Sequence, residues 1–265
     1  SREVTGDARV AVLAGLLTAL SPALVVWPLY WGSNTESAFT ALIVAGLWAS
    51  WRMLRQGRWQ PALVAGLAFG LAYLIRPEGL IWWALYLLIG LVTCIHRKGG
   101  WRALGVFAAI FVLVALPYVI YLYRITDTIQ LAGKTGISVA LGAQITEQGT
   151  AQGNDYGTML DSTGKEVLWL SSEQREYSLA DTIVAEPRAA LRRLVINLRV
   201  VPEELAGPLL GPAFLALIVL GWFGLPWDAS RWQQNGFLLT GLLPLAVVPL
   251  FHVEARLLAP LVPVA

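Results

Sequence analysis

A charged tetrapeptide, Arg76-Pro77-Glu78-Gly79, interrupts a long apolar stretch of the sequence. Ionisable side chains are costly in such surroundings and often belong to functional sites. The planar, permanently charged guanidinium of Arg76 suits bidentate capture of a phosphate group. A simpler interpretation is that Arg76 extends toward the membrane surface and pairs with Glu78 across a turn. The sequence leaves both interpretations open.

Glu36 is a second candidate for chemistry, and it also has a purely structural explanation. The segment Ser33-Asn34-Thr35-Glu36 fits a capping box, in which the carboxylate closes the first turn of a helix. At an outer helix terminus the same carboxylate is suited to binding a sugar hydroxyl, a metal ion or an attacking hydroxyl group. The distance between Glu36 and Arg76 must separate these explanations.

A third group of ionisable residues lies near the C-terminus, where His252, Glu254 and Arg256 fall within five residues. An interfacial salt bridge beside a solvated histidine would explain them, and one His-x-Glu pair is too weak a pattern to predict a metal site. We take these three residues and Lys134 as candidate substrate-binding residues. A divalent metal is compatible with the sequence but not required by it. The sequence has no Gly-rich phosphate loop, no Ser-His-Asp pattern and no cysteine cluster, which argues against soluble nucleotide chemistry.

The elements that must position these residues are membrane helices. Hydrophobic residues make up 57% of the chain and charged residues only 14%, and the mean hydropathy is +0.62. We therefore predict an all-α polytopic membrane protein, and a net charge of +2 gives no reason to expect a nucleic-acid partner. A helix needs about 20 apolar residues to cross a bilayer. Candidate spans lie near residues 10–30, 36–51, 60–75, 80–95, 103–123, 208–226 and 236–251, and an eighth begins at Leu257.

The distribution of Lys and Arg predicts the orientation of these spans. Nine basic residues fall in the connections on one side and two, Arg76 and Arg256, on the other. The positive-inside rule makes the first side cytoplasmic and places Glu36, Arg76 and Arg256 on the outer side. The span at 60–75 would cover roughly 24 Å, less than the roughly 30 Å hydrocarbon core, so Arg76 should lie at or slightly below the outer interface.

The same map predicts three regions along the chain. Residues 1–123 hold five spans, residues 124–207 form an extracytoplasmic loop, and residues 208–265 hold the remaining spans. The first half of the loop is rich in Gly, Thr and Ser, and we expect a short strand near residues 137–139. In the second half, a helix beginning at Pro187 has apolar and basic faces, which suits contact with membrane lipids.

Three motifs, taken in order along the chain, resemble those of a known family. The first leads from Ala19-Leu20-Ser21-Pro22 to Asn34-Thr35-Glu36-Ser37, and the second is a Gly-rich span that ends in Arg76-Pro77-Glu78-Gly79. The third runs from His252 to Pro263, with Leu257 where the family usually has tyrosine. Together they are similar to the polytopic membrane glycosyltransferases of the GT-C class, of the bacterial type that includes protein mannosyltransferase-like and aminoarabinose transferase-like enzymes.

The resemblance implies an enzyme of the cell (inner) membrane that transfers a sugar outside the cytoplasm. Its donor would be a polyprenyl-phosphate sugar, and its acceptor a hydroxyl of a lipid, glycan or protein. Arg76, with Arg256 and Lys134, would neutralise the departing polyprenyl phosphate, and Glu36 and Glu78 complete the expected catalytic set. The family's acidic residue, thought to serve as base or metal ligand, lies in its first outer loop. We expect that residue to precede Ser1 and the sequence to be an internal fragment.

Two other functions remain open at this stage. A transporter or flippase for a lipid-linked saccharide would also need many spans and outer cations, but it predicts charges near the bilayer midplane and related halves. The sequence shows neither feature. A non-catalytic membrane subunit would be favoured if Glu36 and Arg76 lay far apart. The enzyme interpretation requires Glu36, Arg76 and the His252 to Arg256 cluster to converge on one outer cavity.

Overall fold

The computed structural model of the chain describes residues 8–19, 35–133, 141–142, 144–145, 158–160, 163, 165, 167–169, 184, 187–223, 229–250, 253 and 255–262. The chain divides into two compact units. The first unit comprises Ser1–Tyr118, Leu205–Ala246 and Ala255–Ala265, and the second comprises Val119–Glu204 and Val247–Glu254.

Long apolar helices dominate the first unit and make the chain a helical membrane protein. Among the described residues, three helices are long and apolar enough to cross a membrane: α4 (Glu36–Gln56), α6 (Gly79–Arg97) and α7 (Trp101–Thr126). Helix α5 (Trp59–Ile75) is equally apolar but has 17 residues. The short span predicted before Arg76 is therefore a short helix.

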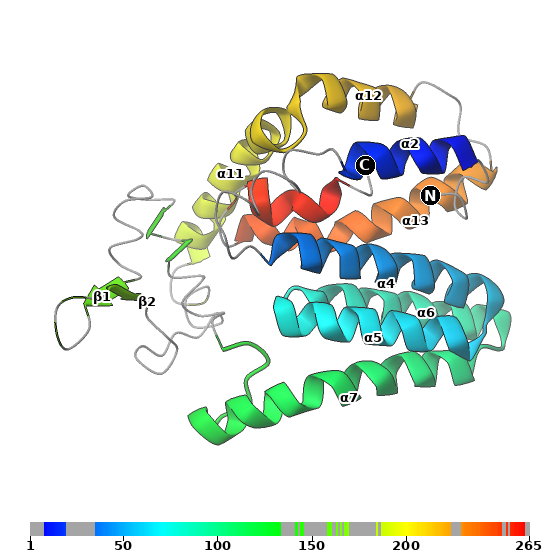
Figure 1. Cartoon of the computed structure of the whole chain (residues 1–265), viewed down its shortest axis with the longest axis horizontal. Coiled ribbons are helices and arrows are strands. Elements are labelled where there is room, and N and C mark those ends of the chain that lie inside the picture. Colours follow the sequence, from blue (N-terminus) through cyan, green and yellow to red (C-terminus); the bar gives the residue numbers. More distant parts are fainter. Residues whose placement is uncertain are drawn as a thin grey trace. The chain divides into compact units, whose positions relative to one another are not determined.

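Helices α4, α5 and α6 are consecutive in the chain, run in alternating directions and pack side by side (Figure 1). Gly57, at φ 63°, ends α4 in the left-handed conformation that glycine adopts most readily. Arg76 ends α5 in an extended conformation, as expected for a residue that precedes proline. Two tight turns thus define two ends of this helix group. We call them the Arg76 end, at Glu36, Arg76 and Gly79, and the arginine-rich end, at Arg55, Arg58 and Arg97.

Glycines allow the helices of this group to approach closely. A Cβ atom added to Gly66 would lie 2.7 Å from the carbonyl oxygen of Phe107, and one added to Gly70 would lie 2.9 Å from Val114. Both contacts are with α7, so the small-residue face of α5 serves helix packing. On the other side, Trp82 of α6 donates a buried 2.9 Å hydrogen bond to the Gly241 carbonyl oxygen of α13 (Ala229–Leu242).

The seven to eight spans predicted from the sequence are not confirmed. Helices α2 (Ala8–Ala19), α12 (Gly211–Phe223) and α13 have only 12, 13 and 14 residues. A π-helical turn, η1 (Leu205–Leu209), precedes α12, and a 3-10 segment, η2 (Leu243–Leu250), follows α13. Where an eighth span is expected to begin, at Leu257, the chain forms a 3-10 segment, η3 (Ala255–Leu261), with Pro260 inside it. Proline removes an amide donor and disfavours a continuous α-helix, and prolines recur in η2 and η3.

The second unit contains a two-stranded antiparallel sheet and an amphipathic helix. Strands β1 (Thr158–Leu160) and β2 (Val167–Trp169) pair with Met159 opposite Leu168. The strand predicted near residues 137–139 lies outside the described residues. Helix α11 (Pro187–Glu204) begins at the predicted proline, and its buried Asn197 donates a 2.8 Å hydrogen bond to the Pro249 carbonyl oxygen.

Candidate active site at the Arg76 end

Three charged residues from three helix ends meet at the Arg76 end. Glu36 is the first residue of α4, Arg76 caps the C-terminus of α5, and Glu78 immediately precedes α6. Arg76 Nη1 lies 3.3 Å from Glu36 Oε1, and Arg76 Nη2 lies 3.4 Å from Glu78 Oε1. The guanidinium thus lies between two carboxylates. We call these three residues the Arg76 triad.

The backbone around Arg76 holds the triad in place. The Arg76 amide donates a 2.8 Å hydrogen bond to the Ala72 carbonyl oxygen, and the Gly79 amide donates a 3.0 Å bond back to the Arg76 carbonyl oxygen. A Cβ atom at Gly79 would lie 2.5 Å from the Tyr73 amide nitrogen. Since α6 begins against the backbone of α5, only a residue without a Cβ atom fits at position 79.

The members of the triad differ in their exposure. The Glu36 side chain is 7% exposed, the Arg76 side chain 15% and the Glu78 side chain 38%. Arg76 Cζ also lies 5.6 Å from the centre of the Phe39 ring, in the range of a cation–π contact. Charge-assisted hydrogen bonds between nitrogen and oxygen are typically about 2.7–2.9 Å long, so both contacts of Arg76 are longer than is typical.

Each carboxylate in the triad has one oxygen that is engaged and one that is not. Glu36 Oε2 and Glu78 Oε2 are both buried, and within the described part of the chain no hydrogen-bond donor reaches either atom. A buried acceptor without a donor costs free energy, commonly about 1–3 kcal/mol. Such an atom is suited to accept a hydrogen bond from a hydroxyl group of a bound molecule.

The structure distinguishes among the explanations that the sequence left open. Glu36 is the first residue of its helix rather than the third, and Thr35 at the N-cap makes no side-chain capping bond. The carboxylate contacts Arg76 instead of completing a capping box. Arg76 does pair with Glu78 across the turn, as the simpler interpretation expected, but it also pairs with Glu36, 40 positions away in the sequence.

The other candidate residues lie largely outside the described part of the chain. Lys134, His252 and Glu254 are not described, and Arg256 is described only in its backbone, within η3. That segment packs against α4, and its residues Leu258 and Ala259 are buried. Convergence of the His252 to Arg256 cluster with Glu36 and Arg76 therefore stays a prediction. Within the described residues, no group of three or more His, Cys, Asp or Glu side chains is arranged to hold a metal ion.

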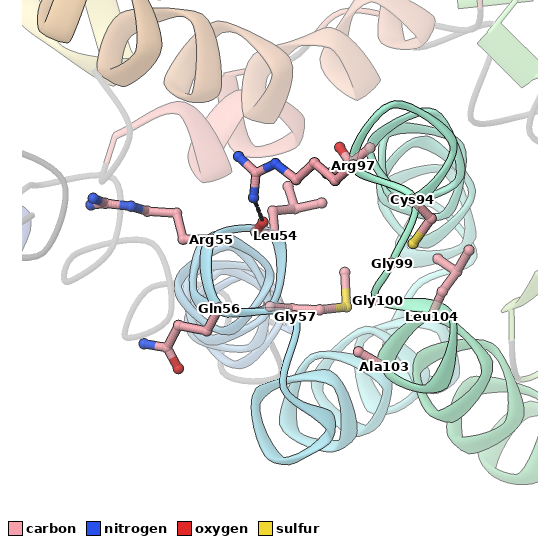
Figure 2. A pocket seen from close by; sticks show the side chains of 13 residues that line it. Leu54, Arg55, Gln56, Gly57, Cys94, Arg97, Gly99, Gly100, Ala103 and Leu104 are labelled. Atoms are coloured by element: carbon pink, nitrogen blue, oxygen red, sulfur yellow. Dashed lines mark hydrogen bonds between the residues drawn. The ribbon is translucent and has the colours of Figure 1, made fainter.

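A cavity of about 260 Å³ lies at the arginine-rich end, far from the triad along α4 (Figure 2). It is bounded by the ends of α4 and α6 and the beginning of α7. Arg97 Nη1 donates a 2.7 Å hydrogen bond to the Leu54 carbonyl oxygen at its edge, while Arg55 points away from the other labelled side chains. Since the Arg97 bond caps the C-terminus of α4, we take this cavity as a packing feature of the turns. Sequence reasoning missed it because these arginines were used only to predict orientation.

Comparison with known proteins supports the assignment of a class. No curated protein and no solved structure gives a significant match to the chain. A family model described as dolichyl-phosphate-mannose-protein mannosyltransferase matches residues 1–121, the part that contains the Arg76 triad. The match confirms the resemblance over the first two sequence motifs, and the third, from His252 to Pro263, lies outside the matched residues. Over residues 1–121 the chain is similar to the dolichyl-phosphate-mannose-protein mannosyltransferases, a glycosyltransferase family of GT-C type.

Proposed function

We propose that this protein transfers a sugar from a polyprenyl-phosphate donor to a hydroxyl group of a lipid, glycan or protein acceptor. The reaction would occur on the extracytoplasmic face of the cell (inner) membrane. The match over residues 1–121 supports a glycosyltransferase, and the Arg76 triad carries the assignment of the site. The triad supplies the two functions that such a transfer needs: a fixed cation and buried carboxylate oxygens without donors.

In this proposal Arg76 stabilises the departing phosphate. A phosphate leaving group needs little protonation when a nearby cation neutralises the charge that develops on it. Arg76 is well suited because Glu36 holds its guanidinium in a mostly buried position, where electrostatic interactions are stronger than in water. Arg256 and Lys134 are proposed to add positive charge around the same phosphate.

Glu36 would bind a hydroxyl group through its unengaged oxygen. Its Oε1 atom accepts a hydrogen bond from Arg76, while no donor among the described residues reaches Oε2, so we assign Oε2 as the acceptor for a hydroxyl proton of the sugar or the acceptor. This assigns Glu36 to orienting a reactant beside the phosphate. The base that deprotonates the acceptor stays assigned, by family resemblance, to a carboxylate of a first outer loop, and His252 and Glu254 are proposed to contact the substrates.

The transporter alternative makes a different demand on the charged residues. It requires charges near the bilayer midplane, whereas the triad lies where α4, α5 and α6 begin or end. This position favours an enzyme that works at the membrane surface. We also propose that the loop of residues 124–207 lies outside the cytoplasm, and that η1, α12, α13 and η2 contribute further membrane-embedded segments, as in a multi-pass protein.

The test is a transfer assay with the protein reconstituted in vesicles. Radiolabelled polyprenyl-phosphate-mannose is supplied as donor, because the matching family is named for mannose transfer. The proposal predicts that label is lost from the lipid and appears in an acceptor. Movement of intact labelled lipid between leaflets, without cleavage of the sugar, would instead establish the transporter and refute the proposal.

A further inference from the structure

The charge of the Arg76 triad raises a difficulty for a site that must receive an anion. Two carboxylates share one guanidinium, so the triad carries a net charge of −1 when all three groups are ionised. A phosphate that simply joined this arrangement would bring a further negative charge into a mostly buried place. Like charges there repel more strongly than they do in water. One carboxylate must therefore release Arg76 when the phosphate binds.

The burial of the two carboxylates decides which one can leave. The Glu36 side chain is 7% exposed, and separating it from Arg76 would leave a buried charge without its partner. Breaking a buried pair in this way is strongly unfavourable. The Glu78 side chain is 38% exposed, so its carboxylate can turn toward water and recover hydration. An ion pair of this exposure commonly contributes little free energy.

The geometry of the turn also favours Glu78 as the group that moves. The 3.4 Å contact of Glu78 with Nη2 is about as long as the 3.3 Å contact of Glu36 with Nη1, so exposure and backbone support, rather than length, separate the two carboxylates. Its backbone is held independently of its side chain, because the Glu78 carbonyl oxygen accepts a 2.9 Å hydrogen bond from the Ile81 amide. The side chain can therefore change rotamer without disturbing the start of α6.

We propose that Glu78 is an internal substitute for the donor phosphate: it occupies Nη2 of Arg76 in the empty site and is displaced when the lipid phosphate binds. This inference rests on the proposed function, since it concerns the same phosphate site. A phosphodiester donor carries one negative charge, so the exchange leaves the charge around Arg76 unchanged. Glu36 stays paired with Nη1 throughout and keeps the guanidinium oriented. The return of Glu78 to Nη2 then favours release of the lipid phosphate product.

The experiment measures binding of the methyl ester of polyprenyl phosphate, a phosphodiester that carries one negative charge and no sugar, to the protein in nanodiscs. Glu78→Gln removes the competing charge while keeping the size of the side chain. Loss of a competitor worth about 0.4–1 kcal/mol predicts a dissociation constant about two- to fivefold lower than that of the unmodified protein. Asp127→Asn is the matched control, because it removes an exposed carboxylate at the end of α7 and should leave the affinity unchanged.

Two results would overturn the inference. Unchanged or weaker binding by Glu78→Gln would show that Glu78 does not compete with phosphate for Arg76. Equal tightening by Asp127→Asn would show that only overall charge matters.

A kinetic measurement separates competition for Arg76 from a purely structural role of Glu78. In the transfer assay, Glu78→Gln should lower KM for the donor without raising kcat, whereas loss of a structural contact would not lower KM. The binding measurement does not depend on sugar transfer. If Glu78→Gln binds the lipid phosphate more tightly but the protein transfers no sugar, the proposed function is refuted, while the exchange of Glu78 for phosphate at Arg76 is not.

Discussion

Arg76 Nη1 lies 3.3 Å from Glu36 Oε1, and this contact joins the end of α5 to the first residue of α4 across 40 positions of sequence. It fixes the direction in which the guanidinium points, while Glu78 contacts its second nitrogen. Because one oxygen of each carboxylate meets no donor among the described residues, the arrangement combines an oriented cation with acceptors that these residues leave unused.

Replacing Arg76 should remove most of the sugar transfer. Arg76→Ala deletes the cation that we assign to the leaving phosphate, and loss of one such stabilising group commonly costs about 10²–10³-fold in kcat. Arg76→Lys should restore little, since an ammonium cannot bridge two carboxylates as a planar guanidinium does. Initial rates with labelled donor measure both variants. Arg102→Gln, which removes a positive charge in the first turn of α7, is the control and should transfer sugar at the normal rate. Near-normal transfer by Arg76→Ala would refute the role of Arg76 in stabilising the leaving phosphate.

Gly79→Ala should destabilise the protein by forcing α6 away from α5. The added Cβ atom would lie 2.8 Å from the Ala72 carbonyl carbon and closer still to the Tyr73 amide nitrogen. Overpacking of this kind typically costs about 1–3 kcal/mol. The midpoint of thermal unfolding in detergent measures the effect. Gly105→Ala is the matched control: its Cβ would meet no atom within 4 Å, so the midpoint should stay the same or rise.

The sequence predicted the Arg76 end better than it predicted the number of spans. The class and the boundaries near Glu36, Arg76 and Gly79 could be read from apolar runs that end at charged or helix-breaking residues. The short span before Arg76 is likewise a 17-residue helix. Hydropathy alone could not show that the apolar run around residues 236–251 changes from α13 to the 3-10 segment η2, since prolines alter backbone geometry without lowering hydropathy.

The triad itself could be predicted only in part. Pairing between Arg76 and Glu78 follows from their spacing of two residues around a turn, which is local information. Pairing between Arg76 and Glu36 depends on the packing of α4 beside α5, and the capping-box pattern pointed to a different role for Glu36. The unengaged oxygens are a property of the assembled site. A sequence pattern shows which residues carry hydrogen-bond donors and acceptors, but it does not show which of these groups bond to one another in the folded protein.

Trp82→Phe should test the packing of α6 on α13. The substitution removes the indole donor and leaves the Gly241 carbonyl oxygen without its buried 2.9 Å hydrogen bond. An unsatisfied buried group commonly costs about 1–3 kcal/mol. We expect a lower unfolding midpoint in detergent. Trp101→Phe, at a side chain 52% exposed, should have little effect; equal losses in the two variants would contradict this packing.

Helix α11 should bind anionic membranes. Its apolar residues Leu191, Val195 and Leu198 are exposed within the second unit, as are Arg188, Arg192 and Arg199. A peptide of residues 187–204 should gain helicity, measured by circular dichroism, with anionic vesicles and less with zwitterionic ones. Replacing the three arginines by glutamine should weaken binding by about 1 kcal/mol per residue. Equal helicity with both kinds of vesicle would contradict an electrostatic contribution.

The central claim is that the Arg76 triad is the site of sugar transfer, and Glu36→Gln tests it most directly. The variant keeps the size of the side chain but removes the charge that orients Arg76 and accepts a reactant hydroxyl. At saturating donor, the account predicts transfer about 10²-fold slower than in the unmodified protein, with the unfolding midpoint showing that the fold is retained. Transfer at an undiminished rate by folded Glu36→Gln would contradict the account.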